Sequence, residues 1–158
     1  MTGDCQICEK HRGAGPLGGL LVLRTERFWI YHAPADDAGL APLGHLFIEA
    51  DRHAPYLADL TSDEAAELGR LRTELARAIR AELGAEFVFA AVIGTGMAHF
   101  HEHLLARHPG TSADVPWHQS DEAAPGADAE AVAALAERLR ARVGDLAVRG
   151  PASRGLAT

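Results

Sequence analysis

The sequence has no long hydrophobic run, and this absence bounds where the protein acts. The longest apolar stretch, residues 18–23, has the length of a strand and falls far short of the ~20 residues that a membrane-spanning helix needs. Residues 1–5 contain no basic segment followed by an apolar core, so they do not resemble a secretory signal. We therefore expect a cytoplasmic protein that does not contact a membrane.

Positive charge is also scarce. The chain has 15 Lys and Arg residues against 22 Asp and Glu residues, which gives a formal net charge of −7. A protein that binds nucleic acid nonspecifically needs a surplus of cations to meet the phosphate backbone. The composition therefore argues against a nucleic-acid partner, but it is compatible with a nucleotide bound in a local pocket.

Cysteine is limited to Cys5 and Cys8, which form a Cys-x-x-Cys pair. A structural disulfide is not expected in a cytoplasmic chain. A redox pair with this spacing belongs at a strand-to-helix junction, and no strand precedes these residues. We therefore interpret the pair as half of a metal site whose other ligands lie elsewhere in the chain.

The bulk composition is that of an ordinary globular protein. The chain has 158 residues, of which 47% are hydrophobic and 23% are charged, and this is enough for one domain with a sizeable core. The last residues lack an apolar pattern. We predict a single domain over residues 1–149 and a disordered tail over residues 150–158.

Hydrophobic periodicity predicts an α+β fold, an antiparallel sheet of about five strands with a central helix and a C-terminal helix. The expected strands are residues 20–23, 28–32, 45–49, 87–93 and about 98–106, and the expected helices are residues 62–83 and 127–143. The central helix has the clearest boundaries, since Thr61 and Glu64 fit a capping box and Gly84 suits a left-handed C-terminal cap. Residues 12–19 and 109–126 are expected to be loops.

Three histidines at alternate positions, His99, His101 and His103, are the main functional signal. On an extended strand their side chains share one face, while Phe100 and Glu102 point to the other. The spacing permits two interpretations. One imidazole attacks phosphorus while another protonates the leaving group, or all three imidazoles bind one metal ion.

A glycine turn stands directly before the three histidines. Glycines at Gly94 and Gly96, with Thr95 between them, let backbone N–H groups approach an anion closely. A phosphate held there would lie beside the imidazoles. This arrangement strengthens the phosphoryl-transfer interpretation without excluding the three-ligand metal site.

The pattern His-x-His-x-His followed by Leu104 and Leu105 resembles the signature of the histidine triad (HIT) superfamily. Other segments resemble its members in order and spacing: residues 5–8, residues 44–53, residues 56–61 and Arg107. The similarity covers residues 5–110. It implies a HIT-like fold and, usually, a homodimer.

The resemblance also implies an activity. The protein would be a nucleotide hydrolase or nucleotidyl transferase acting on the α-phosphate of a nucleoside phosphate derivative, such as a dinucleoside polyphosphate or a nucleoside phosphoramidate. His101 would be the nucleophile, forming a phosphohistidine, and His103 would assist it. The residues implied to bind substrate are Gly94, Thr95, Gly96 and His45.

A structural Zn²⁺ ion is implied as well. In zinc-containing relatives the ligands correspond to Cys5, Cys8, His53 and His99, and such a set leaves no open coordination position. His11, close to the cysteines, ranks below His53 as a ligand. The metal would fix the N-terminus to the histidine strand.

The chain departs from the family pattern at several positions, among them Ala106 in place of proline and a missing asparagine before the glycine turn. Glu102 stands where an apolar residue is expected, Gly96 where phosphoramidases carry serine, and Thr95 where dinucleoside-polyphosphate hydrolases carry glutamine. Because of these differences, the resemblance does not predict which leaving group the substrate carries. They also keep a noncatalytic nucleotide-binding module as an alternative, besides a metal enzyme that uses the three histidines as ligands. Packing or solvation is the simpler expectation for several other candidates: His32, Asp36, Asp37, His108 and Trp117.

Overall fold

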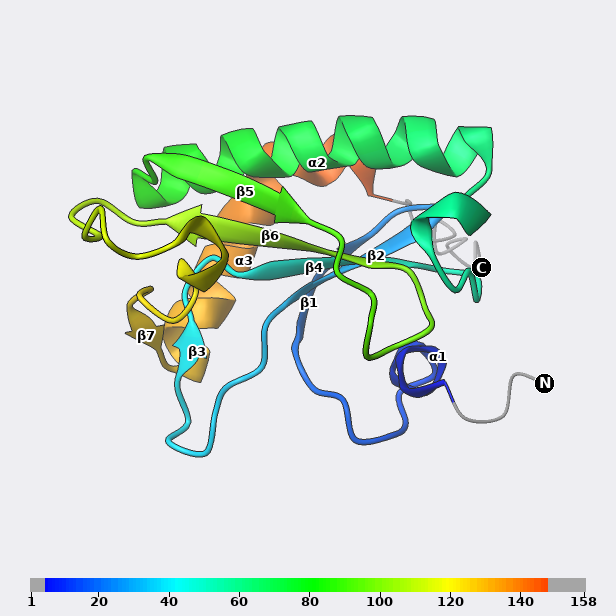
Figure 1. Ribbon diagram of the computed structural model, residues 1–158, viewed down its shortest axis with the longest axis horizontal. Coiled ribbons are helices and arrows are strands. Elements are labelled where there is room, and N and C mark those ends of the chain that lie inside the picture. Colours follow the sequence, from blue (N-terminus) through cyan, green and yellow to red (C-terminus); the bar gives the residue numbers. More distant parts are fainter. Residues whose placement is uncertain (1–4, 148–158) are drawn as a thin grey trace, which may run out of the picture.

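A computed structural model describes residues 5–147 of the chain (Figure 1). The tail predicted over residues 150–158 lies outside the described residues. The main sheet is antiparallel throughout and has five strands in the order β1-β2-β4-β6-β5, which confirms the expected fold class. The bounds are β1 Leu20–Arg24, β2 Phe28–His32, β4 Leu46–Ala50, β5 Phe87–Ala91 and β6 His101–Arg107.

Helices cover the two faces of this sheet unequally. Helix α2 (Ser62–Leu83) lies along one face, and α3 (Ala129–Val143) packs beside α2 and against β1. The short helix α1 (Gln6–His11) lies on the other side of the sheet (Figure 1). Three 3₁₀ turns complete the helical elements: Leu57–Asp59, Trp117–Gln119 and Gly144–Leu146. Within residues 5–147, no helix combines the length and the apolar character that a membrane span requires.

The capping signals of α2 are confirmed in detail. The Thr61 hydroxyl accepts a hydrogen bond from the Glu64 backbone N–H at 3.2 Å, and the Glu64 carboxylate accepts one from the Thr61 N–H at 2.7 Å. Gly84 ends the helix with φ = +62°, in the left-handed region. Glycine adopts this conformation without the steric cost of a Cβ atom.

Several short elements were not predicted. Strand β3 (Ala41–Pro42) pairs with β7 (Gly126–Ala127), so α3 begins two residues later than expected, with Asp128 as its N-cap. Helix α1 has only six residues, too few for hydrophobic periodicity to reveal it. Its first turn is capped by the Cys5 sulfur, which accepts from the Cys8 N–H.

Side-chain alternation on the central strands separates the core from the site. Leu46 and Ile48 of β4 and Leu104 of β6 are fully buried against α2 and α3. Phe47 of β4 and His103 of β6 are paired across the two strands and point to the opposite face. Helices α2 and α3 therefore cover the hydrophobic face of the sheet, and the short helix α1 and loops lie on the histidine face.

The predicted start of the histidine strand, about residue 98, is wrong. Strand β6 begins at His101, so His99 precedes it. The backbone of Phe100 instead bonds to the segment that leaves β4, donating to the Ala54 carbonyl and accepting from the Ala50 N–H. His99 nevertheless faces α1 on the histidine side, while Phe100 is buried in the core.

Candidate active site and metal cluster

Two cysteines and two histidines meet where α1 approaches the end of β4. The nearest ligand atoms of these residues lie within 4.8 Å of one another. The His99 Nδ1 atom is 3.2 Å from the Cys5 sulfur and 3.4 Å from the Cys8 sulfur. The His53 Nδ1 atom is 3.6 Å from the Cys8 sulfur. Within the described part of the chain, this is the one group of three or more such side chains close enough to share a metal ion.

The orientation of His99 fits metal binding. Its Nε2 atom lies 2.8 Å from the Ala50 carbonyl oxygen. A carbonyl can only accept, so Nε2 carries the proton and Nδ1 presents its lone pair to the two sulfurs. Two thiols and two imidazoles are the donor set of a closed tetrahedral zinc site, and the cluster is compatible with zinc. His11 lies outside the cluster, with Nε2 at 2.9 Å from a Glu49 carboxylate oxygen.

His101 has a different orientation. Its Nδ1–H donates to the His99 carbonyl oxygen at 2.8 Å. This hydrogen bond fixes the tautomer and leaves a lone pair on Nε2. An imidazole held in this way is suited to nucleophilic attack or to proton transfer.

His103 is linked to a second histidine. The His103 Nδ1 atom is 3.1 Å from the Nε2 atom of His45, which precedes β4. Burial, and after it the neighbouring His103, lower the pKa of His45 to about 4. Burial and then His101 lower the pKa of His103. The buried pair therefore favours the neutral form of both imidazoles in the free protein.

Asp121 extends this pair and was missed by sequence reasoning. One of its carboxylate oxygens lies 3.4 Å from the His45 Nδ1 atom. The residue belongs to the loop between β6 and α3, which has no periodicity and no motif. The sequence contains no signal that could have placed it beside His45.

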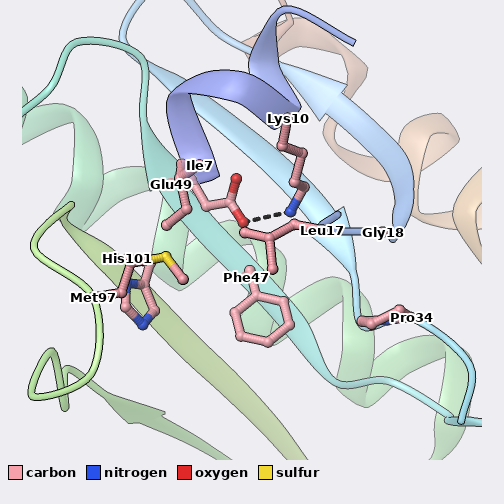
Figure 2. A pocket seen from close by; sticks show the side chains of 9 residues that line it. All are labelled: Ile7, Lys10, Leu17, Gly18, Pro34, Phe47, Glu49, Met97 and His101. Atoms are coloured by element: carbon pink, nitrogen blue, oxygen red, sulfur yellow. Dashed lines mark hydrogen bonds and ion pairs between the residues drawn. The ribbon is translucent and has the colours of Figure 1, made fainter. Parts of the chain in front are cut away.

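A cavity of about 180 Å³ opens beside His101 (Figure 2). Phe47 and Met97 form part of its apolar lining, and Lys10 and Glu49 form an ionic wall with a 2.6 Å hydrogen bond between them. Burial alone would raise the pKa of Glu49, but hydrogen bonds and charge from His11 and Lys10 lower it overall. Glu49 is thus a buried side chain that favours its charged form. It is paired with His101 across strands β4 and β6.

A second cavity, of about 240 Å³, also borders His101. It is bordered by Gly94 and by the loop that contains Tyr56. Gly94 has φ = +66°, whereas Thr95 and Gly96 are exposed beyond the cavity. The structure thus brings the start of the glycine turn to the nucleophile candidate and leaves its other two residues at the surface.

Glu102, the departure from the family pattern, is explained by α2. Its carboxylate is 1% exposed and accepts two hydrogen bonds from the Arg72 guanidinium, one of them at 2.6 Å. A buried carboxylate needs such a partner to offset its desolvation. The side chain points away from the histidine face, as the alternation predicted.

The remaining candidates have local structural roles. His32 is buried between the Ala33 carbonyl and the Gly44 N–H, and His108 bonds to the Leu43 carbonyl. The Asp36 carboxylate accepts hydrogen bonds from two backbone N–H groups of its own loop. Trp117 is 48% exposed, and its ring centroid lies 5.9 Å from that of Phe89 on β5.

No sequence model of a protein family matches this chain, and no curated protein sequence matches it. Solved structures do match its fold. A zinc-bound histidine triad family protein from Mycobacterium smegmatis superposes with a TM-score of 0.65 at 19% identity, over 92% of this chain and 97% of that one. A hypothetical histidine triad nucleotide-binding protein from Sulfolobus tokodaii gives 0.64 at 20% identity, over 90% and 93% of the two chains. A histidine triad protein from Marinobacter aquaeolei gives 0.65 at 15% identity, over 92% and 100%.

These matches define the class of fold. The chain has the histidine triad fold over most of its length. The resemblance inferred from the histidine pattern is therefore confirmed at the level of the fold.

Proposed function

We propose that the protein is a nucleotide hydrolase or nucleotidyl transferase that acts on the α-phosphate of a nucleoside phosphate derivative. The observation that carries the proposal is the orientation of His101. Its Nδ1–H is held by a backbone carbonyl, which leaves the Nε2 lone pair available beside two cavities. The name of the Sulfolobus tokodaii neighbour, a nucleotide-binding protein, supports the choice of substrate.

The reaction proceeds in two balanced steps. The His101 Nε2 lone pair attacks the α-phosphorus, the bond to the leaving group breaks, and the leaving atom takes the Nε2 proton of the fraction of His103 that is protonated, which leaves that imidazole neutral. Water then attacks the phosphorus of the phosphohistidine, gives its proton to His103 and releases the mononucleotide, which restores both imidazoles. In a transferase, another nucleophile replaces water.

Different groups beside His101 bind the phosphate and the nucleoside of the substrate. Backbone N–H groups of the glycine turn, which reaches His101 through Gly94, stabilise charge on the phosphate oxygens. His45 contributes through His103, whose Nδ1 atom it contacts, rather than by touching the phosphate. The apolar cavity with Phe47 in its lining accommodates the nucleoside.

We further propose that Cys5, Cys8, His53 and His99 hold a structural Zn²⁺ ion. When bound, the ion cross-links α1 to the segments that flank β4 and β6. With its four ligands complete it takes no part in the reaction. This geometry supports the phosphohistidine proposal over a metal enzyme with three histidine ligands, since the lone pair of His99 faces the sulfurs and the Nδ1 atom of His101 is bonded to a carbonyl.

A substrate panel tests the proposed activity. We expect release of a mononucleotide from at least one class among dinucleoside polyphosphates, nucleoside phosphoramidates and nucleotide sugars. Mass spectrometry of the acid-labile adduct during turnover should locate the nucleotidyl group on His101. Binding of a mononucleotide without turnover on any of these compounds would instead identify a noncatalytic nucleotide-binding module.

We also propose a homodimer that forms through strand β5. This strand is at the edge of the sheet, and Phe87 on it is 58% exposed. An exposed edge strand with large apolar side chains is a ready surface for pairing with a second copy. Light scattering should give the mass of a dimer for the wild type and of a monomer for Phe87→Glu, and a monomeric wild type would contradict this assembly.

A further inference from the structure

The outer nitrogen of the His45–His103 pair, Nδ1 of His45, is buried and has no complete hydrogen bond. The His45 Nδ1 atom is inaccessible to solvent and has no hydrogen bond of good geometry, although the Asp121 carboxylate lies 3.4 Å away. A buried imidazole nitrogen without a partner costs free energy. The carboxylate is the acceptor that a proton on this nitrogen requires.

The direction of the hydrogen bonds follows from this contact. A carboxylate at neutral pH can only accept, so Asp121 selects the His45 tautomer with the proton on Nδ1. The His45 Nε2 atom then has a lone pair and accepts from the His103 Nδ1–H across 3.1 Å. As a result the His103 Nε2 atom is left free to gain and lose a proton.

We propose that Asp121 is a positioning residue that acts through His45 to orient His103 and to favour its protonated form. The proposal rests on the function given above, in which His103 protonates the leaving group. The carboxylate never touches the substrate. It fixes the tautomers of the two imidazoles and compensates the positive charge that His103 carries before it protonates the leaving group.

The charges around the pair agree with this assignment. Burial and the neighbouring His101 of β6 lower the pKa of His103, and Asp121 acts in the opposite direction. Burial, His103 and His32 of β2 lower the pKa of His45, and Asp121 again opposes them. Asp121 is thus the acidic group that offsets both imidazoles, and it is itself partly exposed at the mouth of the site.

Two substitutions separate the hydrogen bond from the charge. Asp121→Asn keeps an acceptor oxygen for the His45 Nδ1–H and removes the negative charge, whereas Asp121→Ala removes both. In both variants we expect the pKa of His103 to fall by about half a unit to one unit, because the charge of Asp121 raises it and acts across the His45 ring. Asp121→Glu should restore it. Glu122→Gln removes an exposed charge at the adjacent position and serves as the matched control.

Two readouts test the proposal. In the pH profile of kcat/KM, the limb on which activity falls as pH rises should move to lower pH in Asp121→Asn and Asp121→Ala. Above that limb, activity should be lower by about threefold to tenfold, since one pKa unit corresponds to a factor of ten. Nitrogen-15 NMR of the imidazoles gives the tautomers and the titration of His103 without any substrate.

The outcomes are distinct. An NMR shift without turnover on any substrate would retain the positioning role of Asp121 and refute the proposed function. Turnover with an unchanged His103 titration and an unmoved limb would overturn the positioning role, even if the variants were uniformly slower. The same holds if Glu122→Gln produces the same shift.

Discussion

Replacement of His101 by alanine is expected to reduce turnover by on the order of 10³-fold or more, because the variant has no atom to form the covalent intermediate. The side chain is only half-buried and lies outside the core, so thermal stability should change little. The measurement is kcat on the best substrate of the panel, together with a thermal melt. His118→Ala, which removes an exposed histidine that lines neither cavity, is the control.

The metal content of His101→Ala also distinguishes the two interpretations of the three alternate histidines. If zinc is held by the cysteine cluster, His101→Ala retains it. If the three alternate histidines bind one metal ion, His101→Ala loses it while Cys5→Ser does not. Full activity in His101→Ala would refute the assignment of the nucleophile.

The second large effect is expected from the cysteines. Cys5→Ser and Cys8→Ser should each lose the bound metal and lower the free energy of unfolding by about 3 kcal/mol or more, because a structural zinc site contributes its binding energy to folding. For a domain of this size, that corresponds to a fall in Tm of roughly 6–12 °C. Elemental analysis and calorimetry measure both quantities. A chelator should reproduce the loss in the wild type.

His11→Ala is the matched control for this prediction. His11 lies on the same helix but bonds to Glu49, so the variant should retain the metal. Because Ile7 and Lys10 of α1 also line the cavity beside His101, metal loss should raise KM as well. Retention of one zinc per chain in both cysteine variants would rule out the proposed ligand set.

Local chemistry explains which parts of the fold were predictable. The strands and the central helix follow from hydrophobic spacing and from the Thr61–Glu64 cap, both of which act within one element. Helix α1 is too short for such a signal. The start of the histidine strand was misplaced because Phe100 pairs irregularly with the chain after β4, and that contact joins residues far apart in the sequence.

The candidate site also has a part that sequence reasoning predicted and a part that it did not. The alternation of the histidines is a local pattern, and the metal ligands entered through resemblance to a known family. The structure brings Cys5, Cys8, His53 and His99 together. Neither the ionic wall of Lys10 and Glu49 nor the approach of Asp121 to His45 follows from spacing, since each depends on how separate segments pack.

The ion pair between the buried Glu102 and the partly exposed Arg72 bears on the register of β6. If β6 slipped by one residue against β4, every side chain would exchange faces: the imidazoles would enter the hydrophobic core, and Glu102 would lose its only cationic partner on α2. An apolar residue at this position would tolerate the slip far better than a carboxylate does. The acid between the histidines therefore helps to fix the register of β6, which keeps His101 and His103 on the correct side of the sheet without taking part in their chemistry.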